Sequence, residues 1–133
     1  MTAPFFRPLL RKNPGTLVIR NTRNGRIVAH DLISAFDSRS RRVGLLRHRA
    51  FPHGAAMLIA PTNAVHTFFM RFPIDIAFIA RDGTVVKTYS AVRPWRIAVA
   101  LRGYGVIEVA AGTLAACDTA AGDVLAVVPA QQV

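Results

Sequence analysis

The stretch that decides the fold is His66-Thr67-Phe68-Phe69-Met70-Arg71-Phe72-Pro73-Ile74-Asp75-Ile76-Ala77-Phe78-Ile79. Its last six residues alternate, with Ile74, Ile76 and Phe78 on one side and the residues between them on the other, which is typical of a β-strand. Asp82-Gly83 follows as a turn, and residues 84–89 have the composition of a returning strand. The pattern therefore predicts an antiparallel hairpin at the centre of the molecule.

Short β-rich runs continue on both sides of this hairpin. Two of them, residues 16–20 and 26–30, are joined by a polar stretch ending in Asn24-Gly25, which favours a second hairpin. Helical signals are few: Asp37 or Ser38 predicts the start of a short helix ending near Val43, and Thr113 predicts the cap of a single turn through Cys117. Further strands are expected over residues 55–60, 64–70, 104–109 and 124–128. About seven short strands with one or two short helices predict a mainly β fold, either a small twisted sheet or a partly closed barrel.

Length and composition predict one domain. The chain has 133 residues, of which 52% are hydrophobic, enough for one core. We expect residues 16–133 to form a single compact β-rich domain. For residues 1–15 we expect a loosely ordered basic arm, because Phe5–Lys12 is short, basic and interrupted by Pro8.

The apolar runs are too short for a membrane span of about 20 residues, the first residues do not resemble a secretory signal, and Cys117 is the single cysteine. We therefore expect a cytoplasmic protein with no membrane partner.

The charge is large and uneven. The formal net charge is +10, and residues 1–60 hold eleven Lys and Arg against two acidic residues, a net of +9. Such a basic surface attracts phosphate-rich or acidic partners. An alternative is coding bias in a GC-rich genome, which accounts for fifteen Arg against two Lys but not for the scarcity of acids. The candidate anion-binding residues are Arg39, Arg41, Arg42, Arg47 and Arg49, together with Arg93, Trp95 and Arg96.

Trp95 and the polar residues of the apolar strands are the other candidates. Trp95, between two guanidiniums, is suited to stacking on a base, a sugar or another ring, whereas the structural alternative, which large aromatics favour, is that it plugs one end of a barrel. Polar groups in apolar strands need partners, so each is either a structural clamp or part of a site. The polar residues within apolar strands are His66, Thr67, Asp75 and Glu108, and they would form a pocket if their strands are neighbours. For Asp75 the structural alternatives are capping of backbone N–H groups or an ion pair with Arg71 or Arg49.

The sequence contains no recognisable metal, cofactor or nucleophile motif. A His66–Asp75 pair supplies two ligands, too few for zinc, and a third from Glu108, His53 or His30 has no metal-site spacing. Cys117 lies beside Asp118, which disfavours a thiolate, and is expected to be buried and inert. We predict neither metal nor cofactor, and the balance is against an enzyme.

Four motifs together resemble a known family. They are Gly44-Leu45-Leu46-Arg47-His48-Arg49; His66 to Met70 with Pro73-Ile74-Asp75; Asp82-Gly83-Thr84-Val85-Val86; and Glu108 to Thr113 with Ala121-Gly122-Asp123. In this order and spacing, over roughly residues 30–128, the chain resembles the uncharacterised family catalogued as domain of unknown function number 192. Ala110 departs from the family pattern, which often has proline there. The resemblance implies a compact, mainly β domain and carries no activity.

Three hypotheses on function follow. The first is a non-enzymatic binding or accessory domain whose arginines engage nucleic acid or the acidic surface of another protein. The second is a small-ligand-binding or hydrolytic protein with a pocket around His66 and Asp75. The third is a structural module that oligomerises through exposed strand edges.

Overall fold

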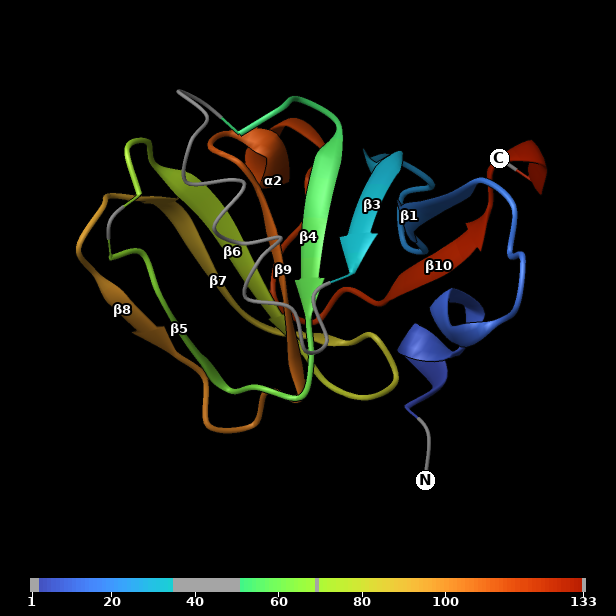
Figure 1. Cartoon of the computed structure of the whole chain (residues 1–133), viewed down its shortest axis with the longest axis horizontal. Helices are drawn as coiled ribbons and strands as arrows, with labels where there is room; N and C mark the ends of the chain where they lie inside the picture. Colours follow the sequence, from blue (N-terminus) through green and yellow to red (C-terminus); the bar gives the residue numbers. More distant parts are fainter. Residues whose placement is uncertain (1–2, 35–50, 69, 133) are drawn as a thin grey trace.

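The computed structural model describes residues 3–34, 51–68 and 70–132, and short strands are their main regular structure (Figure 1). The strands form a five-stranded sheet in the order β3-β4-β9-β6-β7, a three-stranded sheet in the order β10-β1-β2, and a two-stranded sheet of β5 and β8. The elements are η1 (Pro4–Leu10), β1 (Leu17–Asn21), β2 (Ile27–Ala29), β3 (Asp31–Ser34), β4 (Ala55–Ile59), β5 (Ala64–His66), β6 (Ile74–Ile79), β7 (Val85–Val92), β8 (Ile97–Val99), β9 (Gly105–Ala110), α2 (Thr113–Ala116), β10 (Leu125–Pro129) and η2 (Ala130–Gln132).

The predicted mainly β class is confirmed, and both predicted hairpins are present. β1 pairs with β2 and β6 with β7, in each case antiparallel. The described residues contain ten strands rather than about seven, arranged as three sheets and not as a closed barrel. The strand expected over residues 64–70 ends at His66, because the chain turns at Thr67 to contact the segment before β8.

The five-stranded sheet is covered on both faces, so all six residues of β6 are buried. Ala77 and Ile79 face a core shared with residues of β1, β10 and η1. Ile74, Ile76 and Phe78 face a second core, to which the two-stranded sheet contributes Val65 and Ala98. Figure 1 shows β1 and β10 on one side of the central strands and β5 with β8 on the other. The alternation predicted for this strand is correct, and it sorts side chains between two apolar cores.

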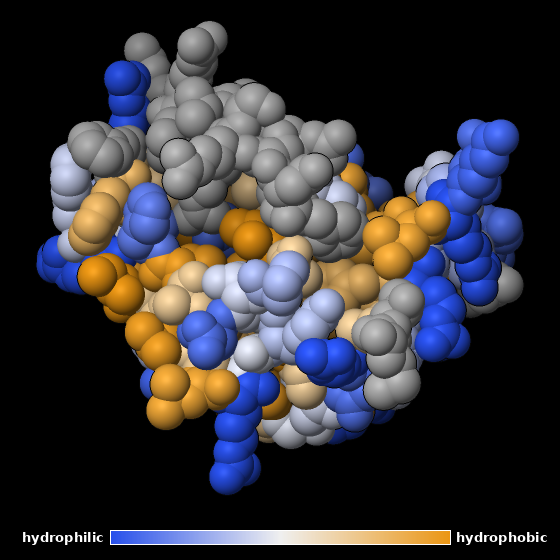
Figure 2. All heavy atoms as spheres, turned by 60° about the horizontal axis from the view of Figure 1, so that its bottom comes forward, coloured by the Kyte–Doolittle hydropathy of each residue, from blue (hydrophilic) through white to orange (hydrophobic). Residues whose placement is uncertain are grey.

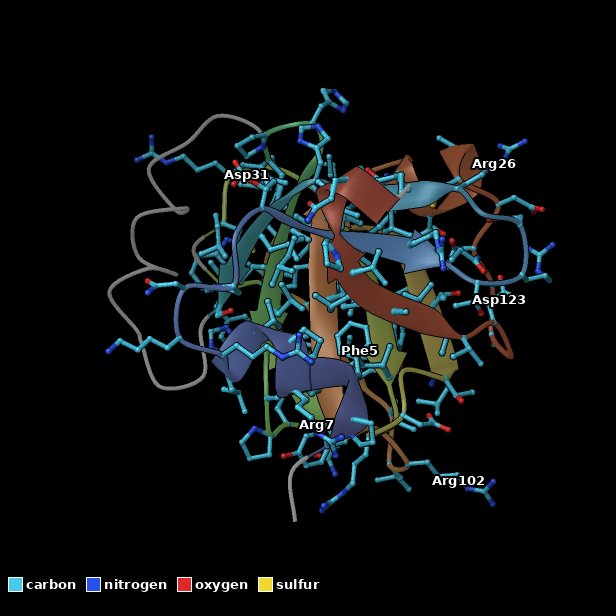
Figure 3. All side chains as sticks on the ribbon, turned by 90° about the vertical axis from the view of Figure 1, so that its right-hand side faces the viewer. Phe5, Arg7, Arg26, Asp31, Arg102 and Asp123 are labelled. Carbon is cyan, nitrogen blue, oxygen red and sulfur yellow. The ribbon has the colours of Figure 1, made fainter. Side chains whose placement is uncertain are left out.

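The structure differs from the loosely ordered arm predicted at the N-terminus. Pro4–Leu10 forms a 3-10 helix in which Phe5 and Phe6 are buried, and Phe5 turns toward the sheets (Figure 3). The Phe5 N–H donates to the Arg81 carbonyl at 3.0 Å. The Phe6 ring packs so closely on Gly105 that a Cβ there would lie 2.6 Å from it. The segment is therefore part of the main core, because its two aromatic side chains find a distant apolar face.

Two predictions lie outside the described residues. They are the short helix between Asp37 or Ser38 and Val43, and the arginine cluster of Arg39, Arg41, Arg42, Arg47 and Arg49. Within the described ranges, no helix is long and apolar enough to cross a membrane.

A polar cluster holds the first hairpin to the segment before β10. Asp123 is buried, and its carboxylate accepts hydrogen bonds from Arg23 Nε at 2.7 Å, Asn21 Nδ2 at 2.9 Å and the Ala120 N–H at 3.0 Å. The Arg23 guanidinium, followed by these N–H donors, holds the pKa of Asp123 well below its ordinary value of 3.8. The ionised carboxylate therefore stabilises the fold.

This cluster predicts a pH dependence of stability. Because the pKa of Asp123 is lowered in the folded protein, its contribution is complete above the unfolded value of 3.8 and is lost as the pH falls toward the folded value. Asp123→Asn should lower the melting temperature at neutral pH, and the difference from the wild type should shrink as the pH is lowered below about 5. Thermal unfolding followed by circular dichroism over this pH range checks it, with Asp31→Asn, at an exposed position, as the control. A difference that is independent of pH would contradict the role given to Asp123.

Candidate functional site

Asp75 is a structural clamp between three parts of the chain. It is 1% exposed on β6. One carboxylate oxygen, Oδ1, accepts the Ala91 N–H at 2.8 Å, at a bulge where the β6–β7 register shifts. The other, Oδ2, accepts the Gly112 and Leu114 N–H groups at 3.0 and 3.1 Å. Gly112, with a φ of 90°, precedes α2. The Asp75 carboxylate therefore accepts N–H groups at the start of this helical turn, a role that the sequence had predicted for Thr113.

Glu108 is also buried, but it faces away from Asp75. In the β6–β9 ladder Asp75 lies opposite Val109, whereas Glu108 lies opposite Ile76. Directly paired residues point to the same face and neighbours along a strand to opposite faces. Val109 belongs to the core beneath β1 and β10, and Ile76 to the other core. The two carboxylates are therefore on opposite faces of the sheet, and the predicted pocket of His66, Thr67, Asp75 and Glu108 is not gathered into one site.

Thr67 is a clamp of another kind. It is buried, and its hydroxyl donates to the Arg93 carbonyl at 2.7 Å and accepts the Arg96 N–H at 2.9 Å. Its main chain also bonds this segment, donating to the Arg96 carbonyl at 2.9 Å and accepting the Trp95 N–H at 3.0 Å. Residues 93–96, which we call the arginine turn, are thereby held to the end of β5. Thr67, predicted to line a pocket, thus bonds to Arg93, Trp95 and Arg96, which were predicted to bind anions.

Three aromatic rings form a stack over this turn. The Phe68 ring centroid lies 4.9 Å from that of His66 and 5.7 Å from that of Trp95, with interplanar angles of 37° and 28°. His66 Nδ1 accepts the Phe68 N–H at 3.2 Å. Trp95 is 56% exposed, so it is not a plug at the end of a barrel. Phe68 was not among the candidate residues, although its spacing of two from His66 was a signal that the two rings share a face.

An apolar row continues from the stack along β8. In the β5–β8 ladder His66 pairs with Ile97 and Ala64 with Val99, and this face points away from the core. Ile97 is 65% exposed and Leu101, in the turn after β8, is 85% exposed. We call the side chains of Trp95, Ile97, Val99 and Leu101 the apolar row. Figure 2 shows exposed apolar residues gathered along one margin of this face of the molecule, with hydrophilic residues beside them.

Basic side chains flank the apolar row at both ends. Arg93 and Arg96 are exposed in the arginine turn, and Lys87 and Arg102 are exposed beside Val99 and Leu101. Arg102 projects outward from the body of the protein (Figure 3). Among the described residues the exposed acidic side chains are Asp31, Asp82 and Asp118. Of these only Asp82, which lines a depression together with Arg102, borders the row. The surface is therefore mostly cationic around an apolar centre.

A shallow groove runs between β7 and the apolar row. It has a volume of about 470 Å³, and Tyr89 lies within it. The Tyr89 hydroxyl donates to the Val99 carbonyl at 2.7 Å and accepts the Val99 N–H at 3.3 Å, which joins β8 to the five-stranded sheet. Lys87, whose Nζ lies 4.8 Å from the Tyr89 ring centroid, lowers the pKa of the phenol. The row is thus held on its two long sides, by Tyr89 and by β5.

Cys117, His30 and His53 are the remaining chemical candidates among the described residues. Within residues 3–34, 51–68 and 70–132, no three His, Cys, Asp or Glu side chains are grouped so that they could hold a metal ion. Cys117 is buried, as predicted, with its Sγ 3.1 Å from Thr119 Oγ1. His30 and His53 line an open pocket of about 430 Å³ beside α2, where His30 packs against Gly54.

The fold and this surface define a mainly β domain that presents a rigid apolar and basic face. The model of the DUF192 family, described as "Uncharacterized ACR", matches residues 19–127, and the chain belongs to this family. The motif resemblance found in the sequence is therefore confirmed. A comparison with curated proteins found no match.

Two solved structures share the fold. A protein of Sinorhizobium meliloti 1021, described as a "putative transcription regulator", is 24% identical, with 84% of this chain and 91% of that chain covered and a TM-score of 0.69. A protein of unknown function from Novosphingobium aromaticivorans DSM 12444 is 19% identical, with 83% and 82% covered and a TM-score of 0.68. At these identities the likeness extends to the fold alone.

Proposed function

We propose that this protein is a non-enzymatic binding domain that engages an anionic partner through the arginine turn and the aromatic stack. One observation carries the proposal: Trp95 is 56% exposed, rests on Phe68, and stands between the exposed Arg93 and Arg96 in a turn held by buried Thr67. An exposed indole held in place beside two guanidiniums needs little ordering when a ligand arrives.

The chemistry of these groups favours an anion. Guanidinium groups bind phosphate or carboxylate through paired hydrogen bonds, and an indole face adds stacking or apolar contact. Since Asp31, Asp82 and Asp118 are the exposed acidic residues of the part of the chain that the structure describes, few carboxylates compete for these arginines there. The five arginines between Arg39 and Arg49 add positive charge to the same chain, and we include them in the proposed basic face.

The enzymatic alternative has less support. A catalytic or ligand pocket would need His66, Thr67, Asp75 and Glu108 to converge, yet Asp75 and Glu108 face opposite cores. Asp75 uses both carboxylate oxygens on backbone N–H groups. We also place the protein in the cytoplasm, which is supported by a single buried, unpaired cysteine.

Polyanion binding tests the proposal. Retention on immobilised heparin and the change in Trp95 fluorescence on titration with poly(U) should both be strong at low salt and decline as salt rises, since phosphate or sulfate contacts release counterions. Trp95 is the only tryptophan, so its emission reports directly on this surface.

A charge-matched pair of variants locates the binding. Arg93→Gln with Arg96→Gln should weaken poly(U) binding about tenfold. The slope of the logarithm of the binding constant against the logarithm of the salt concentration should fall by about one to two, as expected for one or two lost phosphate contacts. The control, Arg7→Gln with Arg11→Gln, removes the same charge from exposed positions in and just after η1, which lies on the opposite side of the central strands from β8 (Figure 1), and should have a smaller effect. No retention at low salt would overturn the proposal. An equal loss of poly(U) binding in the two double variants would also overturn it. So would binding that is weakened neither by the Arg93/Arg96 variant nor by a variant in which Arg41, Arg42 and Arg47 are replaced by Ala.

A further inference from the structure

The apolar row is larger than binding to a polyanion requires. Ile97 and Leu101, at 65% and 85% exposed, have no role in contacting phosphate or carboxylate. Exposed aliphatic side chains of this size are a cost to a soluble surface unless they meet an apolar partner. Ile97, Val99 and Leu101 line one groove. Trp95 is beside them, because it stacks on Phe68, which contacts His66, the residue that pairs with Ile97.

We infer that the anionic partner is a membrane surface rich in anionic lipids, into which the apolar row inserts at the level of the headgroups. The inference rests on the proposed function and names its partner. Peripheral proteins combine shallow insertion of aromatic and aliphatic side chains with attraction between basic residues and lipid phosphates. Here the basic residues stand at both ends of the row, with Arg93 and Arg96 at one and Lys87 and Arg102 at the other.

The row is held so that it can insert without rearrangement. The β8 main chain bonds to β5, and the Tyr89 hydroxyl bonds both the N–H and the carbonyl of Val99 on the other edge. After the strand, the Ala100 N–H donates to the Asn63 carbonyl and the Gly103 N–H to the Ala100 carbonyl. These bonds satisfy main-chain groups near the lipid boundary, where unpaired groups are costly. Trp95 has the amphipathic ring that favours the interface between water and hydrocarbon.

Two other occupants fit the apolar row and its basic flanks less well. A second copy of the chain would bring two sets of arginines and two net charges of +10 together at the row. A nucleic acid would satisfy the arginines and stack on Trp95, but it would leave Ile97 and Leu101 facing water or phosphate. An anionic bilayer meets both requirements at one surface.

The inference changes the expectation of no membrane partner. That expectation came from the lack of an apolar run long enough to span a bilayer. Peripheral attachment needs no such run, because a few exposed side chains and a basic rim are sufficient.

Trp95 emission with vesicles provides the test. Vesicles of pure phosphatidylcholine should leave the emission unchanged, and vesicles in which part of the lipid is phosphatidylglycerol should shift it to the blue and carry the protein into the pellet. Ile97→Ser with Leu101→Ser should weaken this binding roughly tenfold or more while leaving poly(U) and heparin binding in place. Both residues are exposed, so the double variant should fold. Leu10→Ser, at a 58% exposed leucine on η1, is the matched control and should bind vesicles like the wild type.

The possible outcomes separate the two proposals. Binding to poly(U) without a blue shift on anionic vesicles would overturn the membrane inference and leave the binding function standing. Failure with both probes would overturn both. Vesicle binding that is unaffected by the Ile97/Leu101 change, or a dimer in native mass spectrometry that this change abolishes, would also overturn the inference.

Discussion

Asp75→Ala is expected to lower the free energy of unfolding by about 3 kcal/mol, because three backbone N–H groups lose their acceptor. The Leu114 bond is buried and should account for most of the loss. The Ala91 and Gly112 N–H groups belong to exposed residues, so water can partly replace the carboxylate there. The bulge in β7 and the start of α2 should loosen together, since the two carboxylate oxygens join them.

Urea denaturation followed by far-UV circular dichroism measures this loss. Asp75→Asn, which keeps an acceptor oxygen, should fall between the wild type and Asp75→Ala. Asp82→Ala is the matched control: Asp82 is an exposed aspartate whose carboxylate accepts the Thr84 N–H in a turn, and its loss should cost less than about 1 kcal/mol. An Asp75→Ala protein of wild-type stability that no longer bound its partner would mean that Asp75 belongs to a binding site and is not a clamp.

Thr67→Val is expected to lower the free energy of unfolding by about 2 kcal/mol and to weaken polyanion binding as well. The valine has nearly the same shape, so the effect comes from two lost hydrogen bonds of a buried hydroxyl, to the Arg93 carbonyl and from the Arg96 N–H. Without them the arginine turn should lose its fixed position. Trp95 should then become more accessible to acrylamide, which fluorescence quenching measures.

Thr62→Val is the control for this experiment. Thr62 lies just before β5, and its hydroxyl also makes two bonds, donating to the Ala64 carbonyl at 2.7 Å and accepting the Ala64 N–H at 3.3 Å, but at an exposed site. Its replacement should cost little and leave Trp95 quenching unchanged. If Thr67→Val reduced stability while quenching and binding stayed as in the wild type, the hydroxyl would stabilise the core and have no part in positioning the turn.

Much of the local structure was predictable from the sequence. The alternation from Ile74 to Ile79 predicted β6 and its two faces, and Asn24-Gly25 predicted the first hairpin, where Gly25 has a φ of 74°. Such features depend on neighbouring residues only. The family resemblance, carried by motifs over most of the chain, was predictable for the same reason.

The candidate site was predictable only in part. Arg93, Trp95 and Arg96 were chosen as candidates because an indole between guanidiniums is unusual within one segment, but Phe68 was not among the candidates. Asp75 and Glu108 were wrongly grouped, since the face that each strand residue takes depends on the pairing of β6 with β9. The N-terminal segment was wrongly predicted to be loose, because Phe5 and Phe6 are buried by elements more than fifty residues away.

The sequence by itself determined most of the strands, several of the turns, the family and the basic composition, since these follow from backbone preference and charge along the chain, whereas β3 and β8 were not predicted. Only the tertiary structure decided that Asp75 is a clamp, that Thr67 holds the arginine turn, and that four apolar side chains share an exposed face. These outcomes depend on strand register and sheet packing, where a shift of one residue moves every side chain to the opposite face.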